Sequence, residues 1–445
     1  MSDPQTAAAE SRGLASRNIA ADVLRAVLHR RQALDRALDS ETGIEDLRAL
    51  SERDRAFVHM LAAKTLRRLG SLRALLAPLL ERGLPKEAPL VEILLLIGAA
   101  QILFLSVPDH AAVDTAVEIA RGDRAARHYA ALVNAVLRRL AREGKDRLAA
   151  LDLLIDTPPW LRERWIENYG EAVTRKIAAA HRLEPPLDLS VKADAAGWAA
   201  KLGALLLPTG TLRLDAHGPV TALAGYDEGA WWVQDAAAAL PAKLLGDVAG
   251  LAVADLCAAP GGKTAQLAAG GGRVVAVDRS APRLARLKEN MQRLRLACET
   301  VVADAGAWEG GPFDAVLVDA PCTATGTIRR NPDLPWNRTP EDLAKLPVLQ
   351  ARLLDRAATL VKPGGLVVYS TCSLEPEEGE RQIEALLARN SALARLPVAA
   401  GEIGAVDEFL SARGDLRTFP FQLANQNERL CGCDGFYAAR MRRLA

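Results

Sequence analysis

The sequence predicts a multidomain protein, in which an all-α domain is followed by a small α+β module and a doubly wound α/β domain. The first observation is length, because 445 residues exceed what one ordinary hydrophobic core organises. The second is that apolar residues recur at helical spacing almost throughout the first 145 residues. The third is that short apolar strands alternate with helices after about Asp235. We therefore place the domains at residues 1–145, 146–234 and 235–445.

Composition and charge indicate a water-soluble chain in a reducing compartment. Half of the residues are hydrophobic, and the formal net charge of +1 neither requires nor excludes a nucleic-acid partner. The six cysteines are scattered and form no disulfide framework, and the N-terminus carries no signal segment. The most apolar run, residues 90–105, contains Glu92 and Gln101 and is short for a membrane span, so we expect a buried core helix. We therefore expect a cytoplasmic protein that has no membrane partner.

The first domain should contain about six or seven helices. Leucines at 72, 75, 76, 79 and 80 form one apolar stripe, residues 90–105 a central helix, and residues 129–140 the closing helix. Through residue 145 there are 22 Lys/Arg against 18 Asp/Glu. The basic residues cluster, which fits either a solvated face or an RNA phosphate-binding face. The clusters are Arg12 with Arg17, Arg53 with Arg55, Arg67 with Arg68, and Arg138 with Arg139.

The second part reads as a small α+β module. Prolines 158 and 159 break the chain, and two helical stretches follow at residues 160–169 and 172–180. Apolar, β-prone residues then predict strands near residues 185–191, 211–214 and 230–233, with a helix around residues 195–202. Short alternating elements of this kind are typical of an α+β unit.

The α/β part opens with a strand over residues 251–256 and a glycine-bearing turn. A phosphate-binding loop would need glycine where Cys257 stands, and the glycine fingerprint of a dinucleotide site is absent. Small residues with proline and paired glycine remain, and they let the backbone pass close to a nucleoside or amino-acid group. Asp278 ends the second strand, where a carboxylate accepts hydrogen bonds from ribose hydroxyls. Asp304 ends the third, within reach of an adenine amino group.

The glycine-bearing turn, Asp278 and Asp304 together favour S-adenosylmethionine over a nicotinamide cofactor. A carboxylate after a strand is, however, also a common helix N-cap. The candidate cofactor-binding residues are Cys257, Ala258, Ala259, Pro260, Gly261, Gly262, Lys263, Asp278, Asp304 and Asp319.

Two further apolar strands each end in a cysteine. The strand over residues 315–318 is followed by Asp319 and Cys322, and a later strand leads into Cys372. Ligands collect outside the carboxyl ends of strands in such sheets, so these groups are candidates for chemistry. Methylating a cytosine ring carbon needs a nucleophile: a thiolate that adds at C6 makes C5 able to take a methyl group. A second thiol nearby can assist expulsion of the first, and Asp319 can hold the amidine edge of the base.

The motifs resemble those of the Sun/RsmB ribosomal RNA (cytosine-C5) methyltransferases over nearly the whole chain. The catalytic half carries the likeness in residues 255–264 (DLCAAPGGKT), 319–326 (DAPCTATG), 370–373 (STCS), 417–420 (RTFP) and 434–440 (DGFYAAR). The first domain carries it in residues 111–117 (AAVDTAV) and 132–138 (LVNAVLR). The resemblance implies a NusB-like RNA-binding domain, a ferredoxin-like module and a Rossmann-like methyltransferase domain. It also implies that Cys372 attacks, that Cys322 aids product release and that Asp319 completes the catalytic set.

The implied substrate is one cytidine of small-subunit (16S) ribosomal RNA, methylated from S-adenosylmethionine by a monomer. No metal is expected, because the pair Cys431 and Cys433 has no partner pair at zinc-ligand spacing. We also expect residues 329–333, after the first cysteine, to contact phosphates, whereas Trp336 stacks or merely packs.

Alternatives stay open at this stage. DNA cytosine methyltransferases use the cysteine after proline as the nucleophile, which would give that role to Cys322. A separate alternative is a methyltransferase of the same mechanism that acts on tRNA or another RNA. The chain could also be a non-enzymatic RNA-binding assembly or antitermination factor. A nicotinamide-dependent oxidoreductase on the same sheet is disfavoured by the missing glycine fingerprint.

Overall fold

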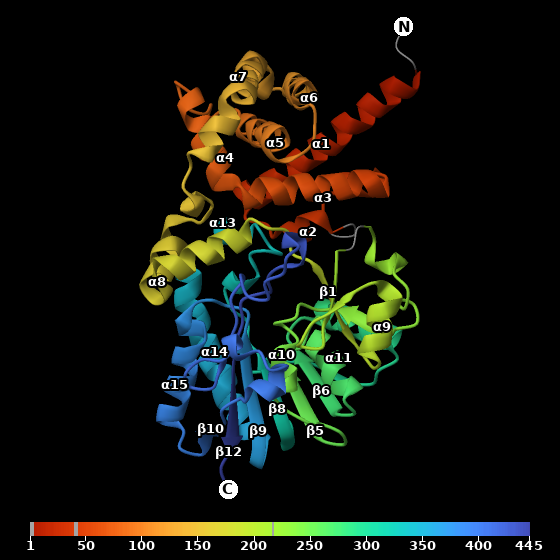
Figure 1. Cartoon of the computed structure of the whole chain (residues 1–445), viewed down its shortest axis with the longest axis vertical. Coiled ribbons are helices and arrows are strands. Elements are labelled where there is room, and N and C mark those ends of the chain that lie inside the picture. Colours follow the sequence, from red (N-terminus) through yellow and green to blue (C-terminus); the bar gives the residue numbers. More distant parts are fainter. Residues whose placement is uncertain (1–3, 40–42, 216–217) are drawn as a thin grey trace. The chain divides into compact units, whose positions relative to one another are not determined.

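The computed structural model describes residues 4–39, 43–215 and 218–445, and it divides into two compact units (Figure 1). The helical unit comprises the chain up to Arg182 together with Asn331–Arg338. The sheet unit comprises Leu183–Arg330 and Thr339–Ala445. Within the described residues, none of the helices combines the length and apolarity that crossing a bilayer requires.

The helical unit is built around one apolar helix, α5, which confirms the core helix expected from residues 90–105. Eleven of its residues are buried, in line with a helix that is apolar on all sides. Gly98 allows a close approach to α7, because a Cβ there would lie 2.5 Å from a methyl carbon of Leu137. The α-helices of the unit are α1 (Pro4–Arg30), α2 (Leu34–Leu38), α3 (Glu52–Arg67), α4 (Leu69–Leu76), α5 (Leu90–Phe104), α6 (Asp109–Gly122), α7 (Ala130–Ala149), α8 (Pro159–His181) and α13 (Leu334–Asn337). Short 3-10 helices are η1 (Glu45–Ala49), η2 (Ala77–Leu79), η3 (Ala126–Tyr129) and η4 (Leu153–Asp156).

The segment Asn331–Arg338 belongs to the helical unit although it lies in the catalytic half of the sequence. The Asp333 carboxylate accepts from the Leu34 backbone N–H at the start of α2 at 3.1 Å. The Trp336 indole N–H donates to the Leu66 carbonyl at 2.9 Å, and its ring packs against the helical core. Trp336 is therefore an internal packing residue in this structure, which answers a question that the sequence left open.

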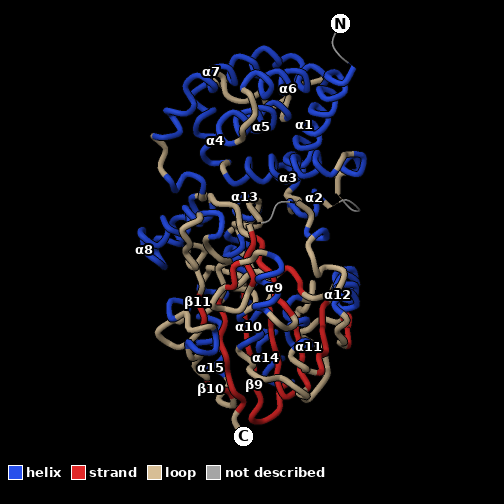
Figure 2. Tube along the Cα trace, turned by 45° about the vertical axis from the view of Figure 1, so that its right-hand side comes forward, coloured by secondary structure: helices blue, strands red, loops and turns tan. Residues whose placement is uncertain are grey.

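The sheet unit contains a mixed sheet whose central strands are parallel, and Figure 2 shows them in red with helices along both sides. The strand order is β10-β12-β9-β8-β5-β6-β7, and β11 pairs with β12. Strand β12 runs antiparallel to β9, so the parallel core ends in an antiparallel edge. The strands are β5 (Ala252–Leu256), β6 (Arg273–Asp278), β7 (Glu299–Val302), β8 (Phe313–Asp319), β9 (Val361–Thr371), β10 (Leu393–Arg395), β11 (Leu416–Arg417) and β12 (Tyr437–Arg443).

Both faces of this sheet are covered, which explains why its strands are continuously apolar. Val316 and Val318 of β8 pack with α14 and α15, whereas Ala315 and Leu317 pack on the other face with α10 and α11. The predicted doubly wound architecture is confirmed. The helices are α10 (Leu240–Lys243), α11 (Gly262–Ala269), α12 (Ala281–Leu294), α14 (Pro340–Leu360) and α15 (Glu380–Arg389), with 3-10 turns η6 (Thr325–Thr327), η7 (Pro376–Glu378), η8 (Ala400–Ile403), η9 (Asp407–Phe409) and η10 (Glu428–Leu430).

A second, antiparallel sheet forms the small module, in the order β2-β3-β1-β4. Its centre holds a buried ion pair: both side chains, Asp188 and Arg213, are fully buried. Two parallel bonds of 2.7 Å join the guanidinium to the carboxylate. Asp188 also accepts from the Ala236 N–H, and Arg213 donates to the Leu430 carbonyl. The pair therefore connects the module to distant segments of the chain. The elements are β1 (Leu187–Val191), α9 (Ala195–Leu202), β2 (Leu205–Leu206), β3 (Leu212–Leu214), η5 (Val220–Ala222) and β4 (Trp231–Val233).

Candidate active site

The two strand-end cysteines meet. Strands β8 and β9 are parallel neighbours in which Asp319 is paired with Ser370, so the loops that follow them lie side by side. The sulfur atoms of Cys322 and Cys372 are 3.5 Å apart, and both residues are partly exposed. The Gly326 N–H donates to the Cys372 carbonyl at 3.0 Å, which joins the two loops again. Strand order thus explains why residues far apart in the sequence form one thiol pair.

The surroundings of the Cys322 thiol favour its protonated form. The hydrogen bond to Cys372 raises the pKa of the Cys322 thiol well above its ordinary value, and burial adds to the shift. Cys322 therefore keeps its proton, and its sulfur lies within hydrogen-bond distance of the Cys372 sulfur. The thiolate is the nucleophilic form of a cysteine.

Asp319 is held at the end of β8 by two side chains. The Lys263 ammonium lies 2.8 Å from one carboxylate oxygen, and the Ser370 hydroxyl donates to the other at 2.9 Å. Lys263 itself is only 8% exposed and lies over the Phe436 ring. The sequence placed Lys263 in the cofactor turn, and the structure also gives it the role of an Asp319 partner. The Asp319 side chain remains 34% exposed, so it can still meet a ligand.

The turn after β5 has the backbone that its composition suggested. Gly261 has a φ of +105°, and a Cβ there would lie 2.8 Å from Leu287, so only glycine fits. Cys257 has a φ of +64°, and burial raises the pKa of its thiol to about 12. An unreactive thiol beside the core agrees with a contribution through its backbone alone. The Ala259 N–H donates to Asp278 at 3.2 Å, which anchors the turn to β6.

The other two predicted carboxylates already have protein partners. Asp278 is 2% exposed and also accepts from the Ser280 N–H at 2.9 Å. Asp304 pairs with Arg352 at 2.8 Å, and its side chain is 49% exposed. Both follow their strands at the same edge of the sheet as the cysteines. Asp278 thus shapes the turn, whereas Asp304 presents an accessible carboxylate.

A cavity of about 490 Å³ has residues 258–263 of the turn and Asp319 in its wall, whereas Asp278 and Asp304 do not line it. Asp255, which sequence reasoning did not select, also lines it and is fully buried. One of its oxygens accepts from the Thr264 hydroxyl at 2.6 Å, and the other has no partner. Burial raises the pKa of Asp255 to about 7. An unpartnered acceptor at a pocket wall is suited to a ligand that brings a donor.

An Asp255→Asn variant should flatten part of the pH dependence of stability. Because the native pKa of about 7 exceeds the roughly 3.9 of an unfolded aspartate, the native state holds a proton that the unfolded chain releases. The stabilisation is present below about pH 4 and is lost as pH rises through 7, by at most about 1.4 kcal/mol per unit. Asparagine keeps an acceptor for Thr264 without titrating. Denaturant unfolding from pH 5 to 8 should show a steeper loss for the wild type, and parallel curves would refute this.

The arginines after the first cysteine form contacts within the protein. Arg329 is 1% exposed and donates to the Cys431 carbonyl at 2.8 Å. Arg330 forms ion pairs with Asp235 at 2.5 Å and with Asp434 at 3.1 Å. The ion pairs of Arg330 brace the wall of the cavity, and phosphate contacts by residues 329–333 stay a prediction.

The arginines of the basic clusters in the helical unit fall into two groups, those with partners inside the unit and those exposed to solvent. Arg17 bonds Gln101 at 2.6 Å, Arg67 is 7% exposed, and Arg68 pairs with Asp156 at 3.1 Å. These arginines hold the unit together. Exposed arginines remain at positions 53, 55, 138 and 139, although the last pairs with Glu143. The side chain of Arg12 lies outside the described residues. The candidate RNA face is thus reduced to the exposed positions.

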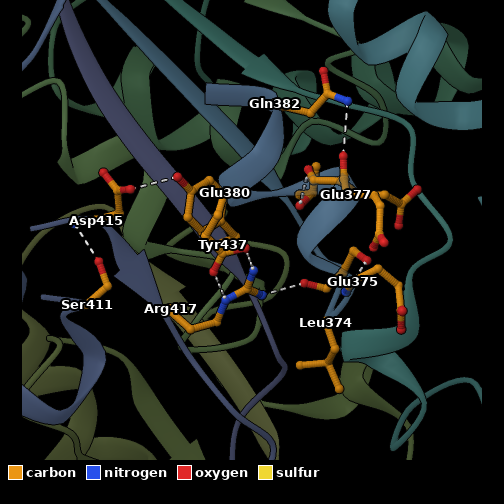
Figure 3. A network of polar contacts seen from close by, with 12 residues as sticks. Leu374, Glu375, Glu377, Glu380, Gln382, Ser411, Asp415, Arg417 and Tyr437 are labelled. Atoms are coloured by element: carbon orange, nitrogen blue, oxygen red, sulfur yellow. Dashed lines mark hydrogen bonds and ion pairs between the residues drawn. The ribbon is translucent and has the colours of Figure 1, made fainter. Parts of the chain in front are cut away.

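The loop that follows the nucleophile is fixed by Arg417, a residue of the quoted RTFP motif. Figure 3 shows its guanidinium joined to Glu380 by bonds of 3.0 and 2.7 Å and to the start of the loop. There it donates to the Ser373 carbonyl at 2.6 Å. Its guanidinium lies 5.0 Å from the ring centre of Tyr437, whose hydroxyl donates to Asp415 at 2.7 Å. Arg417 therefore closes the loop immediately after Cys372.

Among the described residues, no group of three or more His, Cys, Asp or Glu side chains is arranged to hold a metal ion. Cys433 is buried and donates to the Phe419 carbonyl at 3.4 Å, and Cys431 contacts the Asn425 backbone.

Comparison with known proteins identifies the family. Residues 243–442 match the model for 16S rRNA methyltransferase RsmB/F, and residues 14–142 match the NusB family. The chain is 36% identical to ribosomal RNA small subunit methyltransferase B of Pseudomonas putida, over 96% of this chain and 98% of that protein. The crystal structure of PH0851 has the same fold, with a TM-score of 0.74 at 22% identity and coverage of 100% of both chains. NSun6 from Pyrococcus horikoshii, solved with SFG, gives a TM-score of 0.54 at 20% identity over 65% of this chain and 98% of its own. The resemblance seen in the motifs is confirmed, and the chain belongs to the 16S rRNA methyltransferase RsmB/F family.

Proposed function

We propose that this protein methylates C5 of a cytidine in small-subunit ribosomal RNA, with Cys372 as nucleophile, Cys322 as release thiol and S-adenosylmethionine as methyl donor. The observation that carries the proposal is the 3.5 Å approach of the two thiols beside Asp319. A second thiol has no task in simple amino-group methylation, whereas a covalent pyrimidine route has separate tasks for two thiols.

The first step belongs to Cys372 and Asp319. The Cys372 sulfur, with the Cys322 sulfur 3.5 Å away, adds as a thiolate to C6 of the cytosine. The π pair of the C5–C6 double bond moves to C4–C5 and the C4–N3 π pair moves onto N3, so C5 becomes enamine-like and nucleophilic. Asp319 accepts from the exocyclic amino group, and the Lys263 ammonium holds that carboxylate in place. A base presented this way must be unstacked, either flipped or already in a loop.

The second step restores the aromatic ring. After C5 has received the methyl group, its proton passes to solvent and its electron pair forms the C5–C6 double bond. The bond between C6 and the Cys372 sulfur breaks, and the sulfur leaves as a thiolate. The Cys322 S–H, already within hydrogen-bond distance, stabilises that leaving thiolate. The raised pKa of Cys322 keeps it in the protonated form that this role requires.

The cofactor is assigned to the turn and the strand ends beside it. Residues 257–263, Asp278 and Asp304 would hold it with Asp319, and S-adenosylmethionine when bound supplies the methyl group. The turn brings its backbone close to the cavity because Gly261 has no side chain. The unpartnered Asp255 oxygen gives this pocket an acceptor suited to the ammonium of an amino acid. The residues present therefore fit the group.

The test is a Cys322→Ala variant incubated with small-subunit RNA and methyl-labelled cofactor. Methyl transfer should proceed, but the covalent protein–RNA adduct should persist on a denaturing gel, because the leaving thiolate has lost its donor. Cys298→Ala, which removes a cysteine outside the thiol pair, is the matched control and should leave no adduct. Failure of Cys322→Ala to accumulate adduct would count against the proposal. Methylation of tRNA in preference to ribosomal RNA would redirect the substrate and leave the mechanism intact.

A further inference from the structure

The mechanism assigns no role to Glu378, a fully buried carboxylate next to the thiol pair. Its oxygens accept from the Thr323 N–H at 2.9 Å and from the Thr323 hydroxyl at 2.5 Å. The Gln350 side-chain amide donates to it as well, at 3.1 Å. Thr323 directly follows Cys322, so this carboxylate holds the peptide group on one side of that thiol.

Gln350 holds the other side. Its amide nitrogen also donates to the Pro321 carbonyl at 2.9 Å, and Pro321 directly precedes Cys322. Gln350 is fully buried and lies on α14, so it is fixed by a helix rather than by a loop. The peptide groups on both sides of Cys322 are therefore anchored to one Glu378–Gln350 pair.

Glu378 is in turn fixed to the strand that carries the nucleophile. Its backbone carbonyl accepts from the Tyr369 hydroxyl at 2.7 Å and from the Thr371 hydroxyl at 3.3 Å, both on β9. Hydroxyl contacts of Ser373 with Thr323 at 3.3 Å complete the link between the two loops. Glu378 thus connects the Cys322 loop with the strand that leads to Cys372.

A carboxylate suits this place because every neighbour donates to it. Glutamine would keep one acceptor and present an amide N–H₂ where a donor now points. The Thr323 hydroxyl can rotate to accept from that group, whereas the Thr323 N–H cannot. The Gln350 amide could turn its oxygen toward that group only by giving up its bond to the Pro321 carbonyl. Glu378→Gln therefore changes the geometry of the Cys322 loop with almost no change in volume.

We propose that Glu378, acting with Gln350, is the positioning residue that aims the Cys322 S–H at the Cys372 sulfur during product release. The inference rests on the proposed release role of Cys322. It predicts a defect in one step: methyl transfer continues, and breakdown of the covalent intermediate slows. A loss of folding alone would instead affect both steps together.

The experiment is a single-turnover reaction of Glu378→Gln with equimolar RNA, in which methyl transfer and adduct decay are timed separately. We expect adduct decay to slow by on the order of tenfold to a hundredfold, the effect of misplacing a reacting group by about 1 Å. Methyl transfer and the KM for RNA and cofactor should change less than about threefold. Glu377→Gln, the same substitution at the neighbouring residue that pairs with Arg381, is the matched control and should behave as wild type.

A pH series gives a second readout. Burial raises the pKa of Glu378, so it gains a proton at a pH above the usual glutamate range. Adduct decay by the wild type should slow as pH falls and Glu378 gains its proton. Decay by Glu378→Gln should not show this slowing at acidic pH, which is the acid limb of the profile. An acid limb of unchanged size in the variant would overturn the inference.

The outcomes separate the two proposals. If Cys322→Ala accumulates adduct and a folded Glu378→Gln decays as fast as wild type, the positioning role is wrong and the proposed function stands. If neither accumulates adduct, the proposed function fails first. Equal slowing of methyl transfer and decay would also overturn the positioning role. Should Glu378→Gln fold poorly, Gln350→Met keeps the test, because it removes the bonds to the Pro321 carbonyl and to Glu378 and should slow decay in the same direction.

Discussion

A Cys372→Ala variant should lose methyl transfer to small-subunit RNA by a factor on the order of 10⁴ or more and form no covalent adduct. Without the thiolate there is no addition at C6, and C5 remains too electron-poor to attack a methyl sulfonium. The loss should appear in kcat, because Cys372 makes its bond only during chemistry. Labelled methyl incorporation and a denaturing gel measure both effects.

The control for this result is the other thiol. If Cys322 were the nucleophile, as in DNA cytosine methyltransferases, the phenotypes would exchange: Cys322→Ala would abolish the adduct, and Cys372→Ala would retain it. Cofactor binding by Cys372→Ala, followed by calorimetry, should match wild type because Cys372 is not among the residues that line the cavity. A trapped adduct in Cys372→Ala would therefore reverse the allocation.

The second large effect concerns stability. An Arg213→Met variant should lower the free energy of unfolding by about 3–5 kcal/mol, because it leaves the fully buried Asp188 carboxylate without its partner. Burial already raises the pKa of Asp188, so the lone carboxyl must take up a proton or draw in water. Denaturant unfolding of the whole chain, monitored by the tryptophans of β4 at positions 231 and 232, measures the change.

Two matched variants sharpen this measurement. The double variant Asp188→Leu with Arg213→Met should recover much of the loss, since two apolar side chains can replace a buried ion pair. Arg389→Met breaks an exposed pair with Asp355 at 2.8 Å and should cost less than about 1 kcal/mol. A large loss at Arg389, or no loss at Arg213, would show that burial does not set the cost.

The approach of the two thiols was predictable because it depends only on the order and direction of two strands. Apolar strands that end in Asp319 and in the STCS run had to be parallel neighbours for the residues after them to meet, and alternation of strands with helices favours that arrangement. The core helix α5 was predictable for a similar reason: a run that is apolar on all sides has to be buried.

Interactions that depend on distant segments were not predictable. Arg329 and Arg330 look like solvent-exposed loop residues, but residues 431–434 return about a hundred positions later and enclose them. Glu378 lies in a charged run and gives no local sign of burial. Gln350 did offer a signal, because it shares the buried face of α14 with Leu343 and Leu354. A polar residue on an apolar helix face needs a partner, and here that partner was Glu378.

The placement of Asn331–Arg338 in the helical unit has a consequence for synthesis. The chain leaves that unit at Arg182 and returns only for this segment, so the ribosome makes the whole of Leu183–Arg330 in between. Until then the Leu34 N–H and the Leu66 carbonyl lack the partners that Asp333 and Trp336 provide. The helical unit is begun first and completed late, and a gene fragment that stops at Arg182 encodes it without its last helix.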